Sequence, residues 1–313
     1  MINTALIDKR LLKQLLEISP LIGNTPLLNV SIFSENPKVK IYAKAEWHQL
    51  GGSVKARPAF NIIKKAILTG ELNKEKSLID ATSGNTGIAY AAITQKLGIN
   101  TTIVLPENAS LKRKEILKQL GAKIIFTSPF ESTDGAQDKA LELFENHPDR
   151  YFYADQYNNE NNWKAHYQTT APEIIEQTKG KITHFIAGLG TTGTYTGVSN
   201  YFKHNYPEIY IAGLQPDTAL HGLEGWKHLE TANIPGIYQA DLANQFSTIK
   251  TEEAYETVVK AKQLTGLELS PSSAANLLGA QKLSKKIKTG VIVTVFPDNK
   301  EKYEEVYDQL FKN

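Results

Sequence analysis

Short apolar runs, many of them β-branched, alternate along this chain with longer segments of helical periodicity, and no other feature constrains the fold as strongly. We expect strands at residues 41–45, 77–79, 101–105, 123–126, 184–187, 209–214 and 291–296. Helical patterns lie between them at residues 58–68, 87–96, 112–120, 163–177, 253–264 and 274–285. Alternation of this kind predicts an α/β fold in which helices cover both faces of mainly parallel sheets. Because 313 residues are many for one core, two such domains are expected.

Composition excludes several classes of function. The net charge is +2, and basic residues mostly stand beside acidic ones, so nothing indicates nucleic acid or an anionic membrane as a partner. The chain has no cysteine, which excludes disulfides, thiolate catalysis and iron–sulfur ligation. Its seven histidines form no metal-binding motif. We see neither a signal peptide nor a run of roughly 20 apolar residues, and we expect a cytoplasmic protein.

A glycine- and threonine-rich loop follows the strand expected at residues 184–187. Its spacing, Gly188-x-Gly190-x-x-Gly193, matches the dinucleotide-binding fingerprint, so a nicotinamide enzyme is one interpretation. Threonine hydroxyls within the loop favour a terminal phosphate instead, because they add donors for three oxygens. A Rossmann site would also need an acidic residue about 20 positions onward, and Asp217 lies beyond that spacing.

The loop at residues 82–87, Thr-Ser-Gly-Asn-Thr-Gly, lies between an expected strand and an expected helix. It offers hydroxyls, an amide and backbone N–H groups at a helix start, which suits a carboxylate. Ordinary helix capping by Thr82 or Ser83 explains only one hydroxyl of the set.

Lys55 follows Gly51, Gly52 and Ser53, and Pro58 favours a helix that begins near it. A lysine can hold an aldehyde cofactor as a Schiff base if its pKa is lowered, and burial or Arg57 could lower it. Near the other end of the chain, Ser272 and Ser273 precede an apolar helix, so helix capping competes there with a role in a site.

Taken in order, these motifs and others resemble those of one enzyme family. The shared segments are residues 22–27, 44–46, 52–55, 82–87, 156–159, 166–174, 190–194 and 213–216. The chain is similar over nearly its whole length to the fold-type II pyridoxal-phosphate enzymes of the cysteine synthase and cystathionine β-synthase family, most of all to the cysteine synthase B (O-acetylserine sulfhydrylase B) branch. The resemblance implies a tryptophan synthase β-like fold of two doubly wound domains. The smaller domain would comprise residues 48–158 and the larger one residues 1–47 and 159–313.

The same resemblance implies a role for each motif. Lys55 would carry pyridoxal 5'-phosphate as a Schiff base and act as the catalytic base, Asn85 would bind the ring hydroxyl, and Ser272 would face the pyridine nitrogen. The cofactor phosphate would lie in a cup formed by Gly190, Thr191, Thr192, Gly193 and Thr194. The substrate carboxylate would be bound by Thr82, Ser83, Gly84, Thr86 and Gln156. No metal is implied.

The implied reaction is β-replacement. An activated serine, O-acetylserine or O-phosphoserine, would lose its β-substituent to give an aminoacrylate, and sulfide or another sulfur donor would add to form L-cysteine. Members of the family are mostly homodimers, and we expect a homodimer here. The nucleophile stays open among sulfide, homocysteine, an amine and a second amino acid, and a cysteine desulfhydrase or a non-catalytic binding partner are further alternatives. A dehydratase fits less well, because segments 156–159 and 166–174 are of the synthase type.

Some positions depart from the family pattern. Ala56, the pair Gln49-Leu50, Ala274 and the run at residues 297–300 replace residues usual in the family. None of these changes removes a catalytic group, but they leave the substrate open. Lys227 lies in a segment, residues 218–228, that faces the entry to the site in relatives. It is a candidate for recognising an acidic leaving group such as phosphate.

Overall fold

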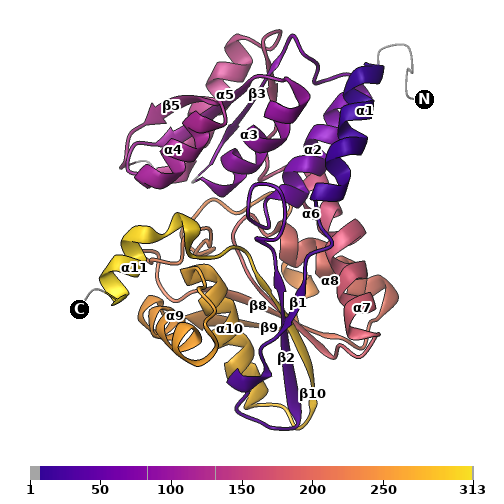
Figure 1. Cartoon of the computed structure of the whole chain (residues 1–313), viewed down its shortest axis with the longest axis vertical. Helices are drawn as coiled ribbons and strands as arrows, with labels where there is room; N and C mark the ends of the chain where they lie inside the picture. Colours follow the sequence, from indigo (N-terminus) through magenta and orange to yellow (C-terminus); the bar gives the residue numbers. More distant parts are fainter. Residues whose placement is uncertain (1–7, 83, 131, 312–313) are drawn as a thin grey trace. The chain divides into compact units, whose positions relative to one another are not determined.

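The computed structural model describes residues 8–82, 84–130 and 132–311, and these fall into two compact units (Figure 1). Unit 1 contains residues 8–23 and 49–162, and unit 2 contains residues 24–48 and 163–311. The chain passes between them three times, because residues 24–48 leave unit 1 to join unit 2. Each unit has its own mainly parallel sheet, which confirms the predicted α/β fold with two parallel-sheet domains.

The sheet of unit 1 is parallel throughout and has the strand order β5-β4-β3-β6. Its strands are β3 (Ser77–Ala81), β4 (Thr101–Pro106), β5 (Lys123–Thr127) and β6 (Tyr151–Tyr153). The helices are α1 (Lys9–Ile18), η2 (Ser19–Leu21), α2 (Ala56–Thr69), α3 (Asn85–Leu97), α4 (Leu111–Gln119) and α5 (Ser132–Asn146).

Alternate residues of these strands face different helices. Leu78 and Ile103 pack into a core shared with α1, α2, α3 and α4. Their neighbours Ile79 and Val104 pack into a second core with Ala136 of α5 and other residues. Because successive strand residues point to opposite faces, the sheet is covered on both sides. Its strands therefore read as the continuous apolar runs seen in the sequence.

The sheet of unit 2 has the order β1-β2-β10-β7-β8-β9, and only β1 runs antiparallel to its neighbour. Its strands are β1 (Leu27–Asn29), β2 (Val39–Ala45), β7 (His184–Gly188), β8 (Tyr210–Pro216), β9 (Gln245–Ile249) and β10 (Gly290–Phe296). Its helices are η3 (Ser31–Phe33), η4 (His166–Thr170), α7 (Ala171–Thr178), α8 (Gly193–Asn205), η5 (Ala240–Leu242), α9 (Thr251–Thr265), α10 (Pro271–Ser284), η6 (Lys300–Lys302) and α11 (Glu304–Phe311). Helix α6 (Glu160–Ala165) contains the passage of the chain from unit 1 to unit 2.

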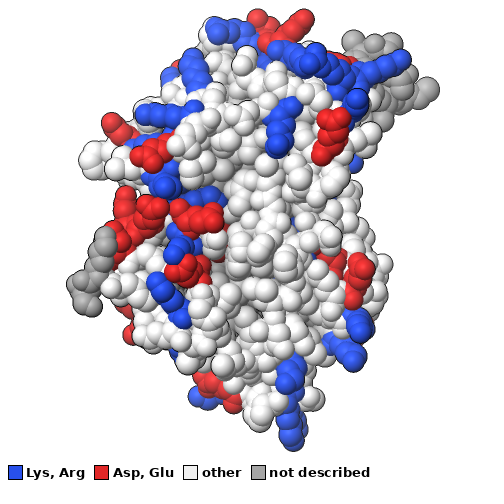
Figure 2. Space-filling model, in the orientation of Figure 1, with Lys and Arg blue, Asp and Glu red and all other residues white. Residues whose placement is uncertain are grey.

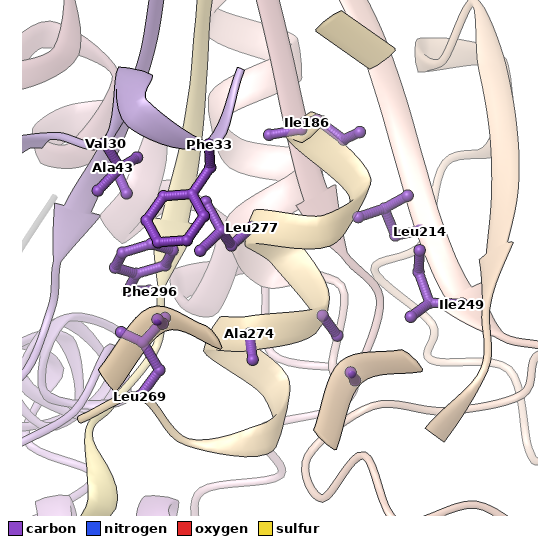
Figure 3. Packing of buried hydrophobic residues seen from close by; sticks show 14 of the residues in the cluster. Val30, Phe33, Ala43, Ile186, Leu214, Ile249, Leu269, Ala274, Leu277 and Phe296 are labelled. Carbon is purple, nitrogen blue, oxygen red and sulfur yellow. The ribbon is translucent and has the colours of Figure 1, made fainter. Parts of the chain in front are cut away.

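One face of this sheet packs against α9 and α10. Figure 3 shows Leu277 of α10 among Phe33, Phe296 and other side chains of that core. On the opposite face Phe185 of β7 meets Phe202 of α8 edge-on, with ring centroids 5.7 Å apart. Unit 2 is thus also doubly wound.

The predicted strands are all present, with ends that differ by up to two residues. The predicted helix at residues 163–177 is a composite of the end of α6, the π-helix η4 and most of α7. Residues 8–23 differ from the predicted domain division. They pack with unit 1, because Leu11, Leu15 and Ile18 of α1 are buried in the core formed with α2 and α3.

Surface charge is mixed. On the face drawn in Figure 2, lysine and arginine side chains stand beside aspartate and glutamate side chains. Among the residues that the structure describes, no helix combines the length and the hydropathy that a membrane span requires.

Candidate active site

Lys55 lies at the start of α2, directly after a loop with two left-handed residues. Gly51 and Gly52 have φ values of 81° and 61°, which glycine adopts without steric cost. A Cβ on Gly51 would stand 3.3 Å from the Cα of Ala89 in α3, so this loop packs closely on α3. Lys55 is half-buried, and Arg57, two positions further along the chain, is 1% exposed. The loop therefore fixes the backbone of Lys55 within unit 1.

The loop at residues 82–87 leads from β3 into α3. Gly84 is the N-cap residue of α3, with a φ of 145° and no side-chain cap among the described residues. The hydroxyl of Thr82 accepts instead from the N–H of Gly84, at 3.0 Å. Ser83 lies outside the described residues. Capping thus does not explain the loop, and the first N–H groups of α3 remain suited to an anion.

Gln156 joins this loop from a distant part of the chain. Its side-chain Oε1 accepts from the hydroxyl of Thr86, at 2.8 Å, and the residue is 1% exposed. Its Nε2 is buried and has no hydrogen-bond partner among the described residues. A buried donor in that state favours an acceptor from a ligand. The structure therefore brings together Thr82, Gly84, Thr86 and Gln156, four of the residues that the family resemblance assigns to a substrate carboxylate.

Asp80 lies directly beneath this loop, and no sequence motif had indicated it. Its carboxylate accepts from the N–H groups of Ala81, at 2.9 Å, and of Gln156, at 3.3 Å. Burial raises the pKa of Asp80 to about 7, and the charge of Asp155 adds to this, whereas hydrogen bonds from Ala81, Tyr90 and Gln156 oppose it. Asp80 thus connects the backbone of Gln156 to β3.

The glycine- and threonine-rich loop of unit 2 connects β7 to α8. Thr192 is the N-cap residue of α8, with a φ of 66°. Its Oγ1 is buried without a hydrogen-bond partner among the described residues, and no side chain caps the helix. A Cβ on Gly190 would lie 1.9 Å from the carbonyl oxygen of Gly225, so only glycine fits there. The loop offers hydroxyl and N–H donors at a helix start, which fits a phosphate.

The segment at residues 218–228 packs on this cup. Trp226 covers Gly188, since a Cβ there would lie 2.1 Å from the indole ring. The N–H of Lys227 donates to the carbonyl of Leu189, at 2.7 Å. Lys227 is half-buried, and its backbone is fastened to the residue that precedes the cup.

Ser272 lies in the first turn of α10 and is 4% exposed. The cap of α10 is Ser270, which accepts from the N–H of Ser273 at 3.2 Å, so Ser272 is not needed for capping. The hydroxyls of Ser270 and Ser272 lie 3.2 Å apart. One turn on, Asn276 accepts from the N–H of Gly188 at 2.8 Å, which ties α10 to the strand that leads into the cup.

The predicted site residues therefore form two groups, one in each unit. Unit 1 holds Lys55 at the start of α2, and it holds Asn85 and the carboxylate residues around the start of α3. Unit 2 holds the phosphate cup, Ser272 and Lys227. The structure adds Asp80, Asn276 and Trp226 to the surroundings of these groups. The sequence signal for Asn276 was a polar residue within an otherwise apolar helical pattern, whereas Asp80 and Trp226 gave no signal.

The residues fit pyridoxal phosphate. The buried hydroxyl of Thr192 and the steric limit at Gly190 match a phosphate, and Ser272 offers a neutral hydroxyl for a ring nitrogen. Lys55 supplies a primary amine. Within the described residues, no group of three or more histidine, aspartate or glutamate side chains could hold a metal ion.

Comparisons with known proteins agree with this fit. Residues 18–298 match the family model described as pyridoxal-phosphate dependent enzyme. The cysteine synthase of Aquifex aeolicus is 44% identical over 293 residues, covering 91% of this chain and 90% of that protein. Cysteine synthase B of Escherichia coli is 35% identical over 284 residues, covering 90% and 92%. The crystal structure of the O-acetylserine-dependent cystathionine β-synthase of Helicobacter pylori has a TM-score of 0.86 and 32% identity, covering 92% of this chain and 96% of its own.

Proposed function

The chain belongs to the family of pyridoxal-phosphate-dependent enzymes, and on that premise we propose that it is a cysteine synthase. It replaces the β-substituent of an activated serine with sulfur, forming L-cysteine. The observation that carries the proposal is the 44% identity to the A. aeolicus cysteine synthase, which extends over 91% of the chain. The fold-type II architecture expected from the sequence agrees with the H. pylori structure.

Pyridoxal phosphate, when bound, supplies an electron sink for bonds broken at Cα of an amino acid. We assign Lys55 to hold the cofactor through its Nζ. The same Nζ would serve as the general base for the Cα proton of the substrate. The loop of Gly51 and Gly52 supports this assignment, because it fixes the backbone from which Lys55 reaches.

The substrate carboxylate is assigned to the loop between β3 and α3. The N–H groups at the start of α3 and the hydroxyls of Thr82 and Thr86 supply donors, and Gly84 lets the backbone turn. Gln156 adds its buried Nε2. Ser83 is assigned to the same group from the family resemblance alone. Several donors on the carboxylate hold the substrate in one orientation, and this fixes the direction of its Cα–H bond.

The remaining assignments concern the cofactor. Its phosphate is held by the cup residues Gly190, Thr191, Thr192, Gly193 and Thr194. Asn85 binds the ring hydroxyl and Ser272 meets the ring nitrogen. A neutral hydroxyl at that nitrogen leaves the ring a weaker electron sink than a carboxylate would, which favours loss of a β-substituent over a long-lived carbanion.

We assign recognition of the leaving group to Lys227. The backbone of Lys227 is bonded to Leu189, the residue before the cup, and this supports a role for its side chain beside bound ligands. We propose that it favours O-phosphoserine by pairing with the phosphate that leaves. O-acetylserine, which has no such charge, would not use it.

The test is a visible absorbance spectrum of the protein loaded with pyridoxal phosphate, recorded before and after adding O-acetylserine or O-phosphoserine. We expect one of them to change the spectrum, and added sulfide to restore it as cysteine forms. A spectrum that responds to neither would overturn the cysteine synthase assignment. A protein that takes up no pyridoxal phosphate would overturn the cofactor as well. Lys55→Ala should abolish the formation of cysteine, whereas Lys64→Ala, which changes an exposed lysine on the same helix, should retain it.

A different nucleophile is the second candidate. The similarity to the H. pylori cystathionine β-synthase favours homocysteine in place of sulfide. Adding homocysteine instead of sulfide in the same assay, and identifying the product by mass, separates the two. From the family resemblance we also propose that the enzyme is a cytoplasmic homodimer. Light scattering after gel filtration would test whether it is a dimer.

A further inference from the structure

His166 is a buried histidine that contacts the phosphate cup, and no motif of the sequence gave it a role of its own. The residue is 1% exposed and begins the π-helix η4. Its Nε2 lies 3.3 Å from the hydroxyl of Thr194, and its Nδ1 lies 2.9 Å from the hydroxyl of Thr170. Thr194 is the last residue of the cup. The three side chains thus form a continuous hydrogen-bonded row that ends at the cup.

The backbone holds this row closely against α8. A Cβ on Gly197 would lie 2.1 Å from the carbonyl oxygen of Trp163 and 2.7 Å from the Cβ of His166. Only glycine permits that approach. A π-helical turn is uncommon and is frequent at functional sites, and here it is closed by a bond from the N–H of Ala171 to the carbonyl of His166. The position of His166 relative to Thr194 is therefore fixed by main-chain packing.

The two hydrogen bonds of this row can have either of two donor–acceptor directions. A neutral imidazole has one donor nitrogen and one acceptor nitrogen, and a hydroxyl has one proton to donate. If Nδ1 carries the proton, His166 donates to Thr170 and accepts from Thr194, and Thr194 then has no proton for a ligand. If Nε2 carries it, Thr170 donates to Nδ1 and Nε2 donates to Thr194. The hydroxyl of Thr194 is then free to donate to an anion.

A phosphate in the cup selects the second direction, because its oxygens only accept. We propose that His166 is a positioning residue for the cofactor phosphate, held as the Nε2–H tautomer by Thr170 so that the hydroxyl proton of Thr194 points at the phosphate. This inference rests on the proposed function, since it requires pyridoxal phosphate in the cup. It names a determinant of cofactor binding that lies outside the cup itself.

The tautomer is measured directly by NMR on protein labelled with ¹⁵N-histidine and loaded with pyridoxal phosphate. The ring signals of His166 are those missing from the spectrum of His166→Gln. We expect a protonated Nε2 and an unprotonated Nδ1. A protonated Nδ1, or an imidazolium with both nitrogens protonated, would overturn the proposal. In Thr170→Val, which lacks the donor to Nδ1, the preference for the Nε2–H form should be lost.

Cofactor affinity provides the second measurement. His166→Leu removes both hydrogen bonds of the row, including the one that orients the hydroxyl of Thr194, and should weaken binding of pyridoxal phosphate about tenfold. Binding of pyridoxal, which lacks the phosphate, should be unchanged. An equal loss for both compounds would contradict a role at the phosphate. His166→Gln, which keeps a donor near the place of Nε2, should retain most of the affinity.

His184 provides a matched control in the same unit. It also pairs with a threonine, since its Nδ1 lies 2.7 Å from the hydroxyl of Thr183, but it begins β7 and the cup follows the other end of that strand. His184→Gln should leave the affinity for pyridoxal phosphate unchanged. If the wild-type protein takes up no pyridoxal phosphate, the proposed function fails. If it does so with His166 in the other tautomer, only this inference fails.

Discussion

Replacing Asp80 with asparagine should alter how the stability of unit 1 depends on pH. Asp80 is 1% exposed in β3, and burial raises its pKa from 3.8 to about 7. Tyr90 of α3 and Asp155 after β6 face it. Burial also raises the pKa of Tyr90, so the phenol keeps its proton at acidic and neutral pH. An asparagine side chain has nearly the same shape as the aspartate but no charge to bury.

The direction of this pH dependence follows from the number of protons that the folded and unfolded chains bind. Between about pH 4 and pH 7 the folded chain keeps the proton of Asp80, whereas the unfolded chain has lost it. The folded state therefore binds more protons in this range, and the free energy of unfolding falls as the pH rises through it. The slope is about 1.4 kcal/mol per pH unit, and the total is roughly 4 kcal/mol, most of it lost by pH 7.

Asp80→Asn removes this dependence. Relative to the wild type, the variant should gain about 2–3 kcal/mol of stability between pH 5 and pH 8. A constant offset is superimposed on the gain, because the amide nitrogen of asparagine cannot accept from the N–H of Gln156, and an unmet buried donor costs about 1–3 kcal/mol. The change with pH, and not the stability at any one pH, is therefore the quantity to compare.

Hydrogen exchange suits the assay, since all three tryptophans, at positions 47, 163 and 226, lie in unit 2 and do not report on unit 1. The slowest amides of β3 and α3 should be followed at pH 5, 6, 7 and 8 and corrected for intrinsic exchange. Asp149→Asn, which changes an exposed carboxylate of the same unit, provides the control and should run parallel to the wild type. Parallel curves for Asp80→Asn and the wild type would refute the reasoning.

Three further changes test other parts of the structure. Lys44 is fully buried and bonded to Glu173 at 2.8 Å, so Lys44→Met should lower the free energy of unfolding by about 3–5 kcal/mol. Urea unfolding followed by tryptophan fluorescence measures this, and a loss below about 1 kcal/mol would contradict it. Gly190→Ala brings a methyl group against the carbonyl of Gly225 and should weaken pyridoxal phosphate binding about 10- to 100-fold, measured by equilibrium titration; unchanged affinity would show that the loop adapts. Lys227→Ala should raise KM for O-phosphoserine about five- to tenfold and leave KM for O-acetylserine unchanged, and an equal effect on both would remove Lys227 from leaving-group recognition.

The sequence indicated the central strands because they are buried on both faces and read as apolar runs. It missed β1, β6 and β9 for the converse reason. Strands β1 and β6 are three residues long, and β9 alternates between half-buried and exposed positions. Three residues are too few to show a period, and in β9 the apolar Phe246 is exposed while Gln245 and Ser247 are half-buried, so the residue types do not follow the burial. They are ordered by pairing with β2, β3 and β8.

Part of the site could be predicted from short segments of the sequence. Glycines at 51, 52, 84 and 190 have local meaning, because a positive φ or a close approach excludes other residues. The lysine, the asparagine loop and the phosphate cup stand beside these glycines, so each segment was a candidate from its own sequence, and the family resemblance supplied the roles.

The family resemblance had assigned Gln156 to the carboxylate loop, but only the tertiary structure decided which contacts from distant residues complete these loops. Gln156 meets Thr86 across 70 positions, Asn276 meets Gly188 across 88, and His166 meets Thr194 across 28. Each contact depends on the register of parallel strands and the packing of helices on them, and a hydrogen bond of about 3 Å is lost when either changes by one residue. The sequence by itself therefore determined the fold class and indicated a candidate chemistry for each loop, whereas strand register and helix packing decided which side chains support them.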